Sequence, residues 1–167
     1  TGNASAQGEA ITFDAMGNII ATGHGRDDDE FGSEMITAKI DPGGTVLWEE
    51  RLDLTDDTSV NETLGSAITT DNAGNVFVGA GVSVNGFSDR DAAIVMYDDD
   101  GTLIDAVFDA RSGNAYPYDF NWIAPDQVIL SGSGPMGLFA SSFDPMGLFE
   151  WTIDVNATVS TTNKAQH

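Results

Sequence analysis

The stretches "EAITFDAMGNIIATGHG" (residues 9–25) and "SAITTDNAGNVFVGAGV" (residues 66–82) align without a gap at an offset of 57 residues. The identical pairs are Ala10–Ala67, Ile11–Ile68, Thr12–Thr69, Asp14–Asp71, Gly17–Gly74 and Asn18–Asn75. The same offset brings Asp41 onto Asp98 and Gly44 onto Gly101. Self-similarity at a fixed spacing predicts that the chain repeats one supersecondary unit.

A third, more divergent copy follows. The stretch "DFNWIAPDQVILSGSG" (residues 119–134) fits the same frame, with Pro125-Asp126 at the first turn. Asp144 and Gly147 repeat the later turn, 46 residues after Asp98 and Gly101. The shorter spacing places a deletion between the second and third strand-like runs of this copy. The sequence therefore predicts three copies of the unit.

Each copy contains four short apolar runs separated by turn signals, which is typical of antiparallel strands. Asp, Gly and Asn stand at residues 14–18 and 71–75, where a hairpin requires positive φ. No run has a helical period, so we expect an all-β chain. The expected strands are 10–14, 18–25, 34–41 and 45–53; then 67–71, 75–82, 92–98 and 102–109; then 119–123, 127–132, 138–144 and 148–154.

Successive four-stranded meanders with apolar residues on both faces predict β-propeller blades. A β-sandwich would have a similar number of strands but would not require gapless copies, so it ranks behind. We expect one partial propeller domain over residues 1–167, with blades at about 9–54, 66–110 and 116–156 and a linker or tail at 157–167. Closed propellers have about four to eight blades. Further blades are therefore expected from a longer chain or from homo-oligomerisation.

The repeat resembles the bacterial β-propeller repeats of the SBBP type, which shade into the NHL and quinoprotein types. The residues that carry the likeness are Ala10, Asp14, Gly17, Asn18, Thr22 and Gly23, then Ala38, Lys39, Asp41, Pro42, Gly44, Leu47 and Trp48. Copy two departs from the pattern with Met96 and Asp105, and copy three restores Trp151. The resemblance implies a fold and says almost nothing about function.

The charge is strongly acidic, with 27 Asp and Glu against 6 Lys and Arg and a net charge of -21. Such a surface repels phosphates, which excludes a nucleic-acid partner. Solubility outside the cell, adaptation to salt and calcium binding remain as interpretations. The absence of cysteine excludes disulfides, zinc-thiolate sites and thiol nucleophiles. No apolar run reaches about 18 residues, so no membrane span is expected.

One acidic loop is a candidate calcium site, because hard carboxylate oxygens suit Ca²⁺. Its candidate ligands are Asp27, Asp28, Asp29 and Glu30, joined by Asp89 and Asp91 from the next copy. The spacing is not that of an EF-hand, and adjacent carboxylates point in different directions. A solvated acidic loop is therefore favoured. It predicts that a chelator leaves the melting temperature unchanged, whereas a structural calcium site predicts a lower one.

The single histidine within the copies, His24, is a weak candidate for a catalytic base. No Ser, Lys or second His is paired with it by spacing, so a structural or surface role is favoured. Trp48 and Trp151 occupy equivalent positions, where packing between blades is favoured over stacking on a sugar. The stretch 98–101 is interpreted as a turn and not as a metal site.

The sequence favours a non-catalytic, extracellular or cell-surface propeller segment that serves as a scaffold for a protein or glycan. It excludes neither of two alternatives. One is the propeller domain of a secreted enzyme, quinoprotein-like or polysaccharide-active, with its active site outside this chain. The other is a subunit of a surface layer or filament. The loops between second and third strands and the linkers between copies form the face where function is expected, since they vary in length and charge.

Overall fold

The computed structural model describes residues 5–26, 32–55, 62–83, 90–108, 115–123, 127–144 and 148–156, which form twelve strands and no helix. Sheet 1 contains β1 (Ser5–Phe13), β2 (Ile19–Arg26), β3 (Glu34–Ile40) and β4 (Val46–Leu52). Sheet 2 contains β5 (Glu62–Thr70), β6 (Val76–Ser83), β7 (Arg90–Tyr97) and β8 (Leu103–Phe108). Sheet 3 contains β9 (Tyr116–Ile123), β10 (Gln127–Gly134), β11 (Gly137–Phe143) and β12 (Phe149–Asn156).

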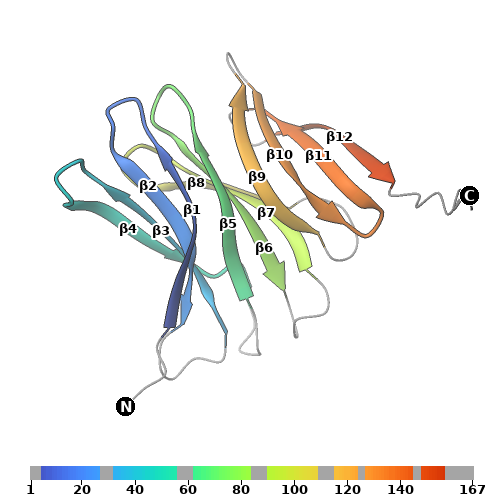
Figure 1. The fold of residues 1–167 in the computed structure, drawn as a ribbon, viewed down its shortest axis with the longest axis horizontal. Coiled ribbons are helices and arrows are strands. Elements are labelled where there is room, and N and C mark those ends of the chain that lie inside the picture. The colour runs from blue at the N-terminus through green and yellow to red at the C-terminus, as the bar shows by residue number, and fades with distance from the viewer. Residues whose placement is uncertain are drawn as a thin grey trace, which may run out of the picture.

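Each sheet is an antiparallel meander in which strands pair in chain order. The prediction of an all-β chain with three four-stranded antiparallel units is thus confirmed. The sheets stand side by side in sequence order, with the first strands β1, β5 and β9 next to one another (Figure 1). Sheet 2 therefore lies between the other two.

The tight turns form where Asp and Gly were expected to make them. The carboxylate of Asp14 accepts hydrogen bonds from the backbone N–H groups of Met16 at 2.9 Å and Asn18 at 2.8 Å. Gly17 has a φ of 82°, a conformation that costs glycine little because it has no Cβ. Equivalent hydrogen bonds and a positive φ recur at Asp71 and Gly74.

The first strand of each sheet starts earlier than the sequence indicated. Residues 5–8 and 62–65 were expected to be linker, but they extend β1 and β5. The register shifts once along each first strand, so that one residue opposes no single partner. Those extra residues are Glu9, Ser66 and Tyr118. Each forms a β-bulge, which reverses the alternation of side chains along the strand. The residues before the bulge therefore do not continue the alternating pattern by which the strand was predicted.

Two apolar layers hold the sheets together, one on each face of sheet 2. The first layer, between sheets 1 and 2, includes Ile20, Met35, Val78, Val95 and Tyr97. The second layer, between sheets 2 and 3, includes Phe77, Ile94, Leu130, Phe139 and Phe143. Sheet 2 is buried on both faces because it has a neighbour on each side, as β6 shows throughout its length.

Candidate functional site

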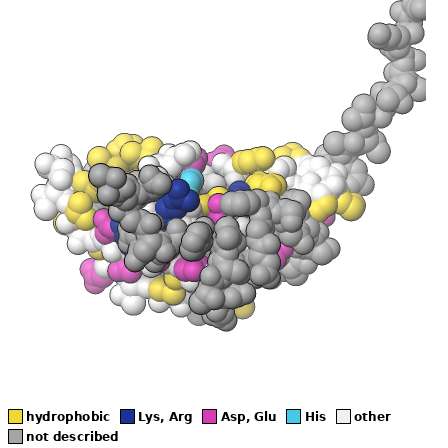
Figure 2. All heavy atoms as spheres, turned by 90° about the horizontal axis from the view of Figure 1, so that it is seen from below, with side chains coloured by type: hydrophobic (Ala, Val, Ile, Leu, Met, Phe, Trp, Pro, Cys, Tyr) yellow, Lys and Arg dark blue, Asp and Glu magenta, His cyan; other side chains and the backbone are white. Residues whose placement is uncertain are grey.

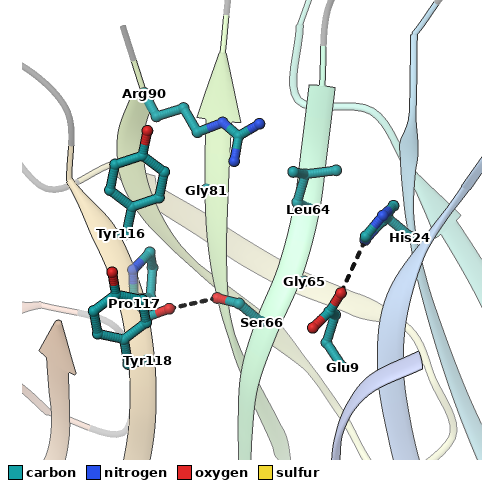
Figure 3. Close-up of a pocket in the computed structure, with 10 residues that line it drawn as sticks. All are labelled: Glu9, His24, Leu64, Gly65, Ser66, Gly81, Arg90, Tyr116, Pro117 and Tyr118. Atoms are coloured by element: carbon teal, nitrogen blue, oxygen red, sulfur yellow. Dashed lines mark hydrogen bonds and ion pairs between the residues drawn. The ribbon is translucent and has the colours of Figure 1, made fainter. Parts of the chain in front are cut away.

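A pocket of about 250 Å³ opens where the three first strands converge. Sheet 1 contributes Glu9 and His24, sheet 2 contributes Ser66 and Arg90, and sheet 3 contributes Tyr116 and Tyr118 (Figure 3). The site lies toward the N-terminal halves of β1, β5 and β9. It is therefore at the end of the sheets that carries the β2–β3 and β6–β7 loops, where function was expected.

The pocket is built on the three bulges. Glu9, Ser66 and Tyr118 are the extra residues of β1, β5 and β9, and all three line the pocket. A bulge redirects a side chain and locally ends regular pairing, which is why bulges often border functional sites. The repeat thus supplies one variable side chain from each sheet to the same place.

His24 and Glu9 face each other across one wall of the pocket (Figure 3). The imidazole Nδ1 lies 3.9 Å from Glu9 Oε1, which is too long for a hydrogen bond. This Nδ1 is buried, and no atom of the described residues forms a hydrogen bond with it. Buried polar atoms of folded proteins rarely lack a hydrogen-bond partner, so this nitrogen is an unsatisfied point in the wall of the pocket.

Ser66 is held by backbone carbonyls. Its Oγ lies 2.7 Å from the carbonyl oxygen of Pro117, to which it donates, and 3.2 Å from that of Gly79. A hydroxyl has one proton to donate, and here that proton is directed away from the imidazole. Among the described residues the pocket therefore contains no serine–histidine pair of the kind that activates a nucleophile.

The third side of the pocket is aromatic. The guanidinium of Arg90 lies 5.5 Å from the ring centroid of Tyr116, within cation–π range, and also pairs with Glu62. The Tyr118 side chain is 65% exposed, and its hydroxyl accepts a hydrogen bond of 3.0 Å from Ser133 Oγ. Each tyrosine thus contacts a polar side chain.

A separate polar cluster joins sheet 1 to sheet 2 and contains Lys39, Asp14, Asp99 and Trp48. The buried Lys39 ammonium lies 3.0 Å from Asp14 Oδ2 and also pairs with Asp99 in the β7–β8 turn. The Trp48 indole donates to the carbonyl of Asp99 at 3.1 Å. The favoured packing role of Trp48 is confirmed, and residues 98–101 form the expected turn, with Gly101 at a φ of 87°.

The same cluster shifts two pKa values. Burial would raise the pKa of Asp14, but hydrogen bonds from Asn18 and Lys39 outweigh burial and lower the pKa to about 2. Burial would lower the pKa of Lys39, but its bonds to Asp99 and Asp14 raise it. Both groups therefore stay charged at neutral pH, and the cluster is structural.

The candidate calcium ligands Asp27, Asp28, Asp29, Glu30 and Asp89 lie outside the described residues. Asp91 is exposed on β7, opposite Val82. Within the described ranges, no three His, Asp or Glu side chains are grouped to hold a metal ion. Over the same ranges, no helix is long and apolar enough to cross a membrane.

The end of the molecule that is seen from below exposes side chains of mixed type (Figure 2). Seen from below, acidic and basic side chains and a histidine lie beside the residues that are not described, and apolar side chains lie toward the rim (Figure 2).

No protein family matches the sequence, and no curated protein does. Among solved structures, the chain is similar to one described as "a putative hydrolase from Bacteroides ovatus ATCC 8483". The two share 11% identity with a TM-score of 0.44. The similarity covers 89% of this chain and 44% of the other, so this chain spans less than half of that protein.

Proposed function

We propose that the chain is a β-propeller segment whose three sheets are blades, and that it acts outside the cell or on its surface as a non-catalytic scaffold that binds a neutral glycan. The main support for this proposal is the pocket lined by the bulge residues Glu9, Ser66 and Tyr118. The SBBP-like repeat supports the blade assignment. The acidic composition supports an extracellular setting.

The chemistry of the lining favours a sugar. A sugar ring presents C–H groups that pack on an aromatic face and hydroxyl groups that need hydrogen-bond partners. Tyr118 offers an exposed ring, and the Glu9 carboxylate offers a hydrogen-bond acceptor in the lining of the pocket. A volume of about 250 Å³ is below the ~300 Å³ typical of pockets for drug-sized ligands, which suits one sugar unit.

Charge and size disfavour the other partners. A net charge of -21 repels anionic sugars and nucleic acid. The one positive group described in the pocket, Arg90, is already paired with Glu62. A protein partner would need a contact area of about 800 Å² on this chain, far wider than the pocket. A neutral glycan end is therefore the best fit.

A Tyr118→Ala variant is expected to bind a neutral oligosaccharide at least about tenfold more weakly than the wild type, because the exposed stacking surface is removed. The ligand is chosen by a glycan-array screen of the wild type, and affinity is measured by isothermal titration calorimetry. Tyr118→Phe is the matched control, since it keeps the ring and loses only the hydroxyl.

We expect Tyr118→Phe to keep affinity within about threefold of the wild type, and both variants to melt like the wild type because Tyr118 is exposed. Equal binding by Tyr118→Ala and the wild type would refute the pocket as the site. An array with no neutral glycan bound would refute the glycan proposal altogether.

A further inference from the structure

Sheet 1 has an apolar face that no described residue covers, although the same face of sheet 2 is buried. Ile68 of β5 is 8% exposed because sheet 1 packs on it, whereas the equivalent Ile11 of β1 is 62% exposed. Side chains of this face also include Ile19, Ala21, Ile36, Ala38 and Ile40. The exposed face of sheet 1 is thus equivalent to the face of sheet 2 on which sheet 1 packs.

The contact between sheets 1 and 2 shows how that packing is made. Trp48 of β4 covers the Gly101 turn of sheet 2, where an added Cβ would lie 2.7 Å from Trp48 Cδ2. The equivalent turn of sheet 1 contains Gly44, which has nearly the same φ. Among the described residues, no atom lies within 4 Å of a Cβ built on Gly44. The turn of sheet 1 therefore has a vacant place for a tryptophan.

A second position has the same pattern. Met35 and Thr22 of sheet 1 press against Gly65 of sheet 2, where a Cβ would lie 3.0 Å from Met35 Cγ. The equivalent Gly8 of sheet 1 lines a hollow of about 210 Å³, and no described atom lies within 4 Å of a Cβ built there. Sheet 1 thus has two recesses at the positions where sheet 2 receives side chains.

Sheet 3 carries matching projections on its own uncovered face. Trp151 of β12 stands opposite Ser142, as Trp48 stands opposite Lys39, and it is 39% exposed. Leu138 of β11 occupies the position of Met35 and is 57% exposed. Both side chains are placed as Trp48 and Met35 are in sheet 1, but no sheet of the described residues packs on either of them.

We propose that the uncovered face of sheet 3 docks on the uncovered face of sheet 1 from a second copy of this chain, with Trp151 over the Gly44 turn and Leu138 in the Gly8 hollow. Sheet 3 cannot reach sheet 1 of its own copy, because sheet 2 lies between them (Figure 1). The contact repeats the one between sheets 1 and 2. A head-to-tail contact closes into a ring where its rotation allows, and we expect two copies joined twice in this way to form a closed pair.

The proposal does not depend on what the pocket binds. Sedimentation equilibrium of residues 1–167 is expected to give twice the 17.6 kDa chain mass, with a dissociation constant that falls as NaCl is raised because salt screens the acidic surfaces. Trp151→Ala is expected to raise that constant at least about tenfold, as for a central tryptophan in an interface. Met136→Asp is the matched control, since Met136 is exposed in the β10–β11 turn, and it should leave the constant unchanged.

Mixing two variants tests the head-to-tail geometry. Ile11→Asp disables the face of sheet 1 and Leu138→Asp disables that of sheet 3, so each alone should be monomeric. An equimolar mixture keeps one intact contact and should form a one-to-one pair. Circular dichroism melts check that each variant is folded. A wild type that stays monomeric at every concentration, or an equimolar mixture that stays monomeric, would overturn the proposal.

Discussion

A Lys39→Met variant is expected to lose about 3 kcal/mol of unfolding free energy at pH 7, the largest effect we predict for a single side chain. Lys39 is almost fully buried and pairs with Asp14, which is equally buried, and with Asp99. Removal of the ammonium leaves the Asp14 carboxylate without its buried counter-charge. Asn18 and backbone donors still bind that carboxylate, which places the loss at the low end of the 3–5 kcal/mol known for such breaks.

The shape of methionine is not expected to cause the loss. Met96 occupies the equivalent position in sheet 2, where Asp71 is held by Asn75 and backbone N–H groups. Urea unfolding monitored by circular dichroism measures the effect, with the double variant Asp14→Asn/Lys39→Met as control. The double variant should recover part of the loss because no buried charge remains. A single variant within about 0.5 kcal/mol of the wild type would show that the cluster does not stabilise the fold.

The second large effect is a loss of stability in acid that depends on Asp14. Its pKa is about 2 in the folded protein and 3.8 in the absence of structure, so the folded state favours the charged form. The resulting stabilisation is fully present above pH 3.8 and is lost as the pH falls toward 2. A difference of this size corresponds to about 2 kcal/mol.

Comparison with Asp14→Asn isolates this residue from the other carboxylates. The wild type should exceed the variant by about 2 kcal/mol in urea unfolding at pH 7, and the gap should shrink to less than about 0.5 kcal/mol at pH 2. The raised pKa of Lys39 affects stability in alkali. The stabilisation from the charged ammonium is fully present below pH 10.5 and is lost as the pH rises further. A gap that is constant from pH 7 to pH 2 would contradict the assignment to Asp14 ionisation.

The sequence was sufficient to predict the strands and turns because each copy repeats the same local chemistry. Asp41, Gly44, Asp98 and Gly101 mark hairpins whose geometry needs those residue types, and the turns form there. The starts of the first strands were missed. In β1 the first residues, Ser5 to Gly8, are Ser, Ala, Gln and Gly, which resemble a linker. The bulge then offsets the alternation of side chains that identifies a strand.

The pocket was not predicted, because its residues are distant in sequence and differ in type. Glu9 and Ser66 are aligned by the 57-residue offset, and this alignment is the one signal that could have paired them. Tyr116 and Tyr118 lie within the expected third blade but before residue 119, where the alignment of the third copy begins. Only the convergence of β1, β5 and β9 brings these side chains together.

A two-dimensional ¹H–¹⁵N NMR titration with the neutral oligosaccharide selected by the array tests whether the three bulges form one glycan-binding site. We expect saturable shifts that are largest at the backbone amides of Glu9, Ser66 and Tyr118, one from each sheet. Shifts confined to one sheet, or located away from the pocket, would contradict the claim that the three bulges form one binding site.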